Sequence, residues 1–151
     1  MSRDFLQLFK SLVALPSVSS AHAHLDMGNR AVIDLLAERF GALGFTCEIM
    51  PLADPRKANL IATLGRGEGG LVLAGHTDTV PFDEALWSSD PLALSERDNR
   101  LYGLGSTDMK GFFAIVHEAV RELEADKLRQ PLVILATADE ESSMEGARAL
   151  A

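Results

Sequence analysis

The chain has 151 residues, of which 47% are hydrophobic and 24% are charged, a composition typical of a folded domain and not of a disordered segment. Lys and Arg number 14 against 22 Asp and Glu, so the formal charge is −8, which argues against a nucleic-acid partner because such a partner requires clustered positive charge. No apolar run approaches the ~20 residues of a membrane-spanning helix, so no membrane partner is expected.

The N-terminal segment predicts an amphipathic helix. Apolar residues recur at helical spacing from Phe5 to Val13, and Pro16 ends the helix. The segment carries Asp4 and has no small-residue cleavage site, so it is not expected to be a secretory signal. The single cysteine, Cys47, cannot form an internal disulfide and suits a reducing cytoplasm, which is the expected location.

The middle of the chain predicts a helix followed by three strands. The helix runs from about residue 28 to 43 and stops at Gly44. FTCEIMPL and ANLIATLG then predict two strands, and the turn RGEGG leads to a third strand, LVLAGH, which is expected to be buried.

The last third of the chain continues this alternation of strands and helices. A short strand, RLYG, precedes a long amphipathic helix, MKGFFAIVHEAVRELEAD. PLVILATA is a near-continuous apolar run, typical of a strand buried on both faces of a parallel sheet. The alternation predicts an α/β layered domain. The final helical segment, EGARALA, has no terminating signal, so the chain is expected to be the N-terminal piece of a longer protein.

Titratable side chains follow three of the predicted strands. The pair His76 and Asp78 follows LVLAG, Asp108 lies between the RLYG strand and the long helix, and residues 139–141 (DEE) follow VILATA. In open α/β sheets, sites gather at the carboxyl ends of the strands. If these strands are parallel, all of these groups meet at one edge of the sheet.

Carboxylates packed together need a cation or protons to offset their repulsion. One neutral imidazole, His76, together with several carboxylates suits Zn²⁺ or a related divalent ion, and the number of acidic groups fits two ions better than one. Asp78 is expected to accept the other N–H of the imidazole and so fix its tautomer. Asp139 is expected to cap a helix or loop, and Lys110, at an unfavourable helix start, is expected to offset the nearby carboxylates.

Three motifs carry a family resemblance. GHTDTVP, GLGSTDMKG and ATADEESSMEGAR resemble the successive motifs of the M20 metallopeptidase family of di-zinc amidohydrolases, over nearly the whole chain. The detailed wording is most similar to the acetylornithine deacetylases of that family. The resemblance implies the three-layer αβα sheet of zinc-dependent exopeptidases. Residues 1–151 would form the N-terminal part of the catalytic domain, without the lid domain that makes the family homodimeric and without the C-terminal part that supplies further ligands.

The resemblance also implies roles for five residues. His76 would bind one of two divalent ions (Zn²⁺ or Co²⁺), Glu141 would bind the other, and Asp108 would bridge them through a cis peptide to Met109. Glu140 would be the general base on the bridging water, with Asp78 as a second catalytic residue.

The implied reaction removes the acetyl group from N-acetyl-L-ornithine to give ornithine and acetate, a step of arginine biosynthesis. The alternative within the family is desuccinylation of N-succinyl-diaminopimelate, or another M20 aminoacylase or peptidase activity. The chain alone is expected to be inactive, because some of the ligands lie outside it.

An alternative class is a nucleotide-binding α/β module, which the glycine-rich segments GRGEGG and GLGSTD suggest. The first segment precedes a strand and not a helix, so it does not form an anion-binding helix terminus. The second segment opens a helix, but Asp108 would lie where the phosphate binds and would repel it. Both observations weigh against this alternative.

Overall fold

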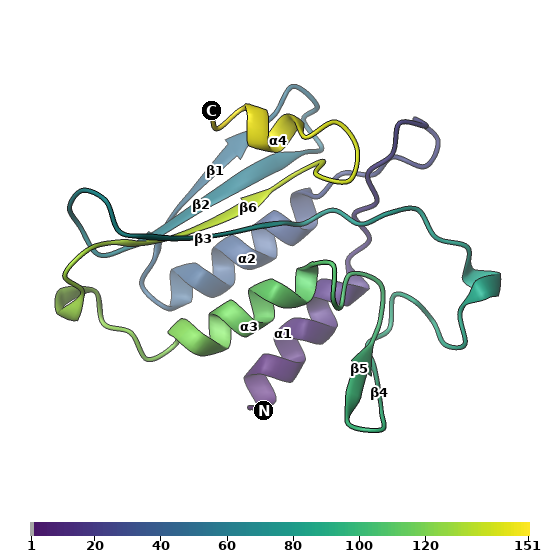
Figure 1. The fold of residues 1–151 in the computed structure, drawn as a ribbon, viewed down its shortest axis with the longest axis horizontal. Helices are drawn as coiled ribbons and strands as arrows, with labels where there is room; N and C mark the ends of the chain where they lie inside the picture. Colours follow the sequence, from purple (N-terminus) through teal and green to yellow (C-terminus); the bar gives the residue numbers. More distant parts are fainter. Residues whose placement is uncertain (1) are drawn as a thin grey trace.

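The computed structural model describes residues 2–151, which form a four-stranded sheet with helices against it (Figure 1). The helices and strands follow one another in this order: α1 Arg3–Ala14, α2 Arg30–Ala42, β1 Thr46–Pro51, β2 Ala58–Leu64, β3 Leu71–His76, the 3₁₀ turn η1 Glu84–Leu86, β4 Ser95–Arg97, β5 Arg100–Tyr102, α3 Lys110–Val120, the 3₁₀ turn η2 Ala125–Lys127, β6 Leu132–Thr137 and α4 Glu145–Arg148. The predicted α/β class is confirmed.

The sheet is mixed, with the strand order β1-β2-β6-β3. Strand β2 pairs antiparallel with both β1 and β6, whereas β3 pairs parallel with β6 in a register that places His76 opposite Thr137. Strands β4 and β5 form a separate hairpin, and its tight turn uses the left-handed conformations of Asp98 (φ 53°) and Asn99 (φ 57°).

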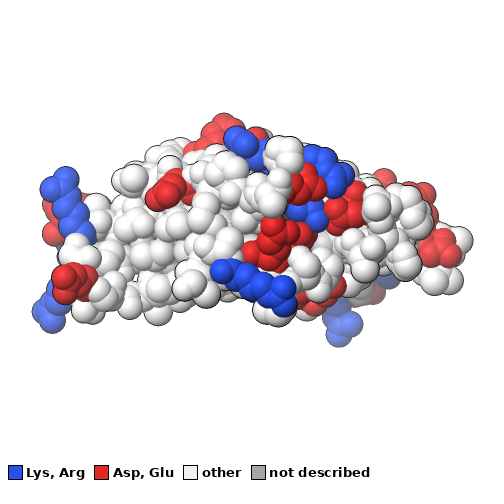
Figure 2. Space-filling view, turned by 90° about the horizontal axis from the view of Figure 1, so that it is seen from above, with Lys and Arg blue, Asp and Glu red and all other residues white. Residues whose placement is uncertain are grey.

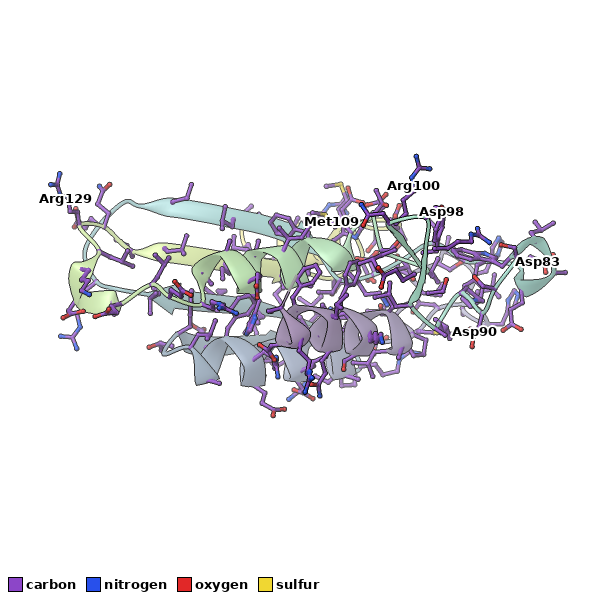
Figure 3. The ribbon with its side chains drawn as sticks, turned by 90° about the horizontal axis from the view of Figure 1, so that it is seen from below. Asp83, Asp90, Asp98, Arg100, Met109 and Arg129 are labelled. Carbon is purple, nitrogen blue, oxygen red and sulfur yellow. The ribbon has the colours of Figure 1, made fainter. Side chains whose placement is uncertain are left out.

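Alternate residues of the central strands form the core on one face of the sheet. On this face α2 packs against β1 and β2, α3 packs against β3, and α1 packs on α3. Figure 3 shows the helices from below, with Met109 near the middle of the view, where α3 begins, and Arg129 at the left end of the molecule. The strand residues of this core are at most 7% exposed: Leu60, Ala62, Leu64, Leu132, Ile134 and Ala136.

The other face of the sheet carries only the short helix α4 among the described residues. Asn59, which is fully buried there, donates through Nδ2 to the backbone oxygen of Gly146 in α4 (2.8 Å). Figure 2 shows this face from above, with few charged side chains over its middle and a mixed cluster of acidic and basic ones farther to the right. Residues 2–151 therefore supply the sheet and one helical layer of the expected three-layer arrangement, and α4 alone on the opposite side.

Local signals in the sequence fix the ends of the helices. The hydroxyl of Ser2 accepts the backbone N–H of Phe5 (3.0 Å) and caps α1, which ends just before Pro16. Gly44, with φ +87°, ends α2 in a conformation that favours glycine. Asn29 precedes α2, but its side chain does not cap the helix. Nδ2 of Asn29 donates to the backbone oxygen of Ala58, and its Oδ1 accepts the backbone N–H of the same residue.

Three predictions about the strands are wrong. Strand β3 was expected to be buried, but it is an edge strand whose Leu71 and Val72 are 60% and 52% exposed. Strand β6 is buried on its helix-facing side only, because Val133 and Leu135 point to the open face. The RLYG strand is not part of the main sheet, since among residues 2–151 β5 pairs with β4 alone.

None of the helices formed by residues 2–151 combines the length and the apolar character needed to cross a membrane.

We expect the substitution Leu36→Ala to lower the free energy of unfolding by about 2–5 kcal/mol, because Leu36 is fully buried between α2 and the sheet and its loss leaves a cavity. Urea unfolding followed by circular dichroism measures the loss. The matched control is Leu86→Ala, since Leu86 is 84% exposed and should change stability little. Equal losses in both variants would contradict this assignment of the core.

Candidate metal centre

The parallel pair β3 and β6 brings two of the predicted segments to one end of the sheet. The pairing continues one residue past β3, where the backbone N–H of Thr77 donates to the backbone oxygen of Thr137 (2.9 Å). His76 therefore leaves the sheet next to the loop that begins at Ala138 and carries Glu140 and Glu141. The prediction that these groups meet at the carboxyl ends of neighbouring strands is confirmed for His76 and this loop.

Asp108 reaches the same place by another route. As predicted, it lies between the RLYG strand, which is β5, and the helix α3, but β5 belongs to the separate hairpin and not to the main sheet. Its Oδ1 lies 3.0 Å from Nε2 of His76. The peptide bond from Asp108 to Met109 is cis, as predicted.

Close packing at the end of β3 depends on Gly75. A Cβ at this position would lie 2.9 Å from both Met109 and Phe112, at the start of α3. Glycine therefore lets α3 approach β3 directly beside His76, which brings the Asp108 loop within reach of the imidazole.

Glu140 and Glu141 complete the cluster around His76. Oε2 of Glu140 lies 3.8 Å from Nε2 of His76. One ligand atom from each of His76, Glu140 and Glu141 lies within 4.8 Å of the others. His76 is buried, with a side chain 7% exposed, whereas those of Asp108 and Glu140 are 72% and 46% exposed. The carboxylates of Asp108 and Glu140 thus face solvent, and the imidazole of His76 lies buried at the inner side of the cluster.

Asp78 is buried beneath this cluster and holds its backbone. Its carboxylate accepts the backbone N–H groups of Glu140 (3.1 Å) and Glu141 (3.0 Å), and also the hydroxyl of Ser19 (2.6 Å). Nδ1 of His76 lies 3.1 Å from the backbone oxygen of Asp78 and 3.5 Å from its Oδ1. The nearest acceptor for the imidazole N–H is therefore the backbone of Asp78, and the carboxylate mainly fixes the two glutamates.

The electrostatics of the cluster favour a positive charge. Burial alone would lower the pKa of His76, but the hydrogen bond and charge of Asp78, with the hydrogen bond to Asp108, outweigh it and raise the pKa to about 9. Burial raises the pKa of the Glu141 carboxyl, and the negative charge of Asp108 adds to the increase. The same negative potential that favours a proton on His76 favours a divalent cation.

The donor set fits a divalent metal ion. One imidazole nitrogen and several carboxylate oxygens lie within a few ångström of each other, and these are the ligands that zinc and related ions take in proteins. Asp108 is not one of the three residues whose ligand atoms lie within 4.8 Å of each other, but its Oδ1 contacts Nε2 of His76.

Two other predictions about charged residues are wrong. Asp139 does not cap a helix or loop through its side chain, because its carboxylate pairs with the buried ammonium of Lys57 (2.8 Å). Lys110 does not offset the carboxylates of the cluster. Its side chain is fully buried and turns toward α1, where Nζ donates to the backbone oxygen of Leu15 (2.8 Å).

Ser19 and Lys57 contact the cluster's supporting residues but were not expected from the sequence. Ser19 lies in a polar loop and Lys57 precedes a strand, and neither position has a distinctive motif. Only the folded chain brings them together, because each binds a carboxylate at least 59 residues away in sequence.

Comparison with known proteins places this site in a wider group. The family model described as Peptidase family M20/M25/M40 matches residues 72–151. The acetylornithine deacetylase of Photorhabdus laumondii is 55% identical over 145 residues, covering 95% of this chain and 38% of that protein. The acetylornithine deacetylase of Pasteurella multocida is 57% identical over 146 residues, covering 96% and 38%. The chain thus spans about two fifths of the length of these curated relatives.

The fold has solved counterparts. The crystal structure of human carnosine dipeptidase 1 matches with a TM-score of 0.77 and 25% identity, covering 97% of this chain and 34% of that one. This similarity extends over almost all of the sheet and helices described above.

We expect Lys110→Met to change the pH dependence of stability. Burial lowers the pKa of Lys110 to about 8, below the value of 10.5 in an unfolded chain. Between these pH values the unfolded chain therefore binds more protons than the folded chain. As the pH rises from 8 to 10.5, the free energy of unfolding of the wild type should increase relative to that of the variant, by roughly 3 kcal/mol at most. Urea unfolding of both proteins from pH 7 to 10.5 measures this difference.

The control for this prediction is Lys127→Met, because the Lys127 side chain is 69% exposed and pairs only with Glu124. The same measurements on this variant show what the removal of an exposed lysine does to stability. A difference between wild type and Lys110→Met that stays constant from pH 7 to 10.5 would contradict the lowered pKa of Lys110.

Proposed function

Because the chain belongs to Peptidase family M20/M25/M40, we propose that it forms part of a metal-dependent amide hydrolase that converts N-acetyl-L-ornithine to ornithine and acetate. The observation that carries the proposal is the cluster of His76, Asp108, Glu140 and Glu141 at the end of the parallel pair. The substrate follows from the relatives named above. It is proposed for the whole protein, since the chain spans only part of their length.

The proposed centre holds two divalent ions, Zn²⁺ or Co²⁺. Nε2 of His76 would bind one ion, the carboxylate of Glu141 would bind the other, and Asp108 would contact both. When bound, such ions polarise the acyl carbonyl and lower the pKa of water. The exposure of Asp108 and the burial of His76 fit this arrangement, because the substrate would approach from the solvent side.

Glu140 is the proposed general base. Its carboxylate is 46% exposed and lies 3.8 Å from the imidazole, so it is within reach of both solvent and the ion site. It would accept a proton from the attacking water at Oε2 and donate it to the leaving amine. Asp78 would act through the backbone. Its carboxylate accepts the N–H groups of Glu140 and Glu141 and so fixes the backbone from which these two side chains extend.

We propose further that the whole protein works in the cytoplasm, in arginine biosynthesis, and as a homodimer. The single cysteine of these 151 residues supports the location, because one thiol cannot form a disulfide within them. The pathway and the homodimer rest on the family resemblance.

The substitution Glu140→Gln tests the role of the base. In the whole protein, kcat for N-acetyl-L-ornithine is expected to fall about 10²- to 10⁴-fold, because the amide cannot accept a proton, while bound metal is retained. Steady-state kinetics and metal analysis measure both. The matched control, Glu122→Gln, changes a glutamate that is 84% exposed and should keep full activity.

Two results would count against this proposal. An unaffected Glu140→Gln variant would remove Glu140 from the mechanism. A wild-type protein that prefers N-succinyl-diaminopimelate would overturn the choice of substrate while leaving the amide hydrolase.

The substitution His76→Gln tests the metal site. It should weaken binding of one Co²⁺ ion by at least about tenfold, because the neutral amide is a poorer ligand than an imidazole. Calorimetric titration of the metal-free whole protein with Co²⁺ measures the affinity. His24→Gln, in an exposed loop, is the control and should bind like wild type. Unchanged binding by His76→Gln would show that the ion does not use His76.

A further inference from the structure

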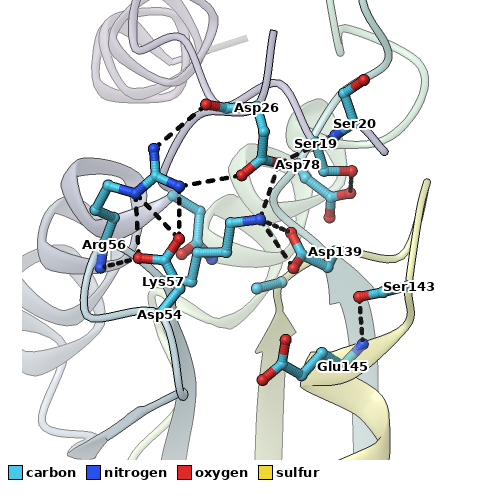
Figure 4. A network of polar contacts seen from close by, with 12 residues as sticks. Ser19, Ser20, Asp26, Asp54, Arg56, Lys57, Asp78, Asp139, Ser143 and Glu145 are labelled. Carbon is cyan, nitrogen blue, oxygen red and sulfur yellow. Dashed lines mark hydrogen bonds and ion pairs between the residues drawn. The ribbon is translucent and has the colours of Figure 1, made fainter. Parts of the chain in front are cut away.

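A buried ammonium lies beneath residues 138–144, the loop between β6 and α4 that carries Glu140 and Glu141 and is called the metal-binding loop below. This ammonium has no role in the proposed chemistry. Nζ of Lys57 donates to both carboxylate oxygens of Asp139, at 2.8 and 2.9 Å, and to Oδ1 of Asp26, at 2.9 Å (Figure 4). The side chains of Lys57, Asp139 and Asp26 are only 8%, 6% and 12% exposed. Lys57 immediately precedes β2, Asp139 lies in the loop after β6 and Asp26 lies in the loop before α2, so the contact joins three separate segments.

Asp139 has an unusual backbone conformation at the start of the metal-binding loop. Its φ is +60°, in the left-handed region that few residues other than Gly, Asn and Asp adopt. Its backbone oxygen accepts the N–H groups of Ser142 (3.3 Å) and Met144 (2.6 Å), which closes the loop around it. Such a conformation persists where surrounding contacts hold it, and the ammonium of Lys57 holds the side chain of the same residue.

The next two residues are Glu140 and Glu141, whose backbone N–H groups both point at the carboxylate of Asp78. The loop is therefore held at two places. Lys57 binds the side chain of Asp139, and Asp78 binds the backbone of the two residues that follow. A change in the turn at Asp139 would rotate both N–H groups away from Asp78 and shift both glutamates relative to His76.

Stability alone does not account for this arrangement. The desolvation of two buried charges offsets most of their attraction, so a buried ion pair is a weak source of folding free energy. Its effect is directional, because the two hydrogen bonds from Lys57 to Asp139 fix the orientation of one carboxylate.

We propose that Lys57 is a positioning residue of the metal centre, which sets the spacing of Glu140 and Glu141 from His76 by holding the left-handed turn at Asp139. This inference rests on the proposed function, since it assigns a role to the support of the same site. The carboxylate of Asp26 also accepts a hydrogen bond from the Lys57 ammonium and so helps to orient it toward Asp139.

The test compares Lys57→Met with wild type in the whole protein, by titration of the metal-free form with Co²⁺ and by the visible absorption spectrum of the Co²⁺ form. Methionine keeps the length of the side chain and removes the charge. We expect at least one Co²⁺ to bind about 10- to 100-fold more weakly, as is typical when a residue that orients a ligand is lost, and the absorption bands to change in position or intensity. The spectrum reports ligand geometry, which a purely structural role would leave unchanged.

The control is Arg56→Met, which removes the neighbouring cation from the same segment. The Arg56 side chain is 55% exposed and pairs with Asp54 and Asp26 but not with Asp139, so Co²⁺ affinity and spectrum should match wild type. If Lys57→Met leaves Asp139 uncompensated and prevents folding, the double variant Lys57→Met/Asp139→Asn removes both charges and is measured instead, with the same expected loss of affinity.

Wild-type affinity and spectrum in the folded Lys57 variant would overturn the inference, even if the variant is less stable. An equal loss in Arg56→Met would also overturn it, because the effect would then not be specific to the contact of Lys57 with Asp139. The proposed function fails separately, if wild-type protein binds Co²⁺ but does not hydrolyse N-acetyl-L-ornithine. A wild-type protein that binds no Co²⁺ would overturn the metal centre and this inference with it.

Discussion

The parallel pairing of β3 with β6 is the constraint on which the candidate site depends. The register that sets His76 opposite Thr137 makes both strands end at the same level, so that an imidazole and an acidic loop leave the sheet side by side. An antiparallel pair would have sent the two segments to opposite ends of the sheet. Every other contact at the site, including the approach of Asp108 from outside the sheet, is built around this shared end.

The carboxylates near this end fall into two groups that the protein treats differently. The buried ones have partners within the chain, since Asp139 binds Lys57 and Asp78 binds Ser19 and two backbone N–H groups. The exposed Asp108 and Glu140 and the half-buried Glu141 pair with no Lys or Arg among residues 2–151. The acidic groups that support the site therefore have partners within the chain. The negative charges of Asp108, Glu140 and Glu141 have no Lys or Arg partner among these residues and lie on the solvent-facing side, where a cation can bind.

The sequence predicts the elements well and their surroundings less well. Helical spacing and end signals located α1 and α2 to within a few residues, because these signals are local. The sequence does not predict that β3 is exposed, since an apolar run such as LVLAG does not reveal how many strands flank it. The segments around His76, Asp108 and Glu140 were visible as motifs, but the pairing of Lys57 with Asp139 joins residues 82 apart in sequence and follows only from the tertiary fold.

The position of β3 has a consequence for how this part of the protein behaves in solution. Among the described residues its outer edge has no strand partner, and Leu71 and Val72 lie exposed along it. A free edge offers main-chain donors and acceptors to any extended segment, and an apolar edge without a lysine or proline lacks the usual protection against such pairing. This edge is therefore the place on the sheet where a further strand can pair. Any strand that added there would lie directly beside His76, so edge-to-edge assembly and access to the site would compete for the same space.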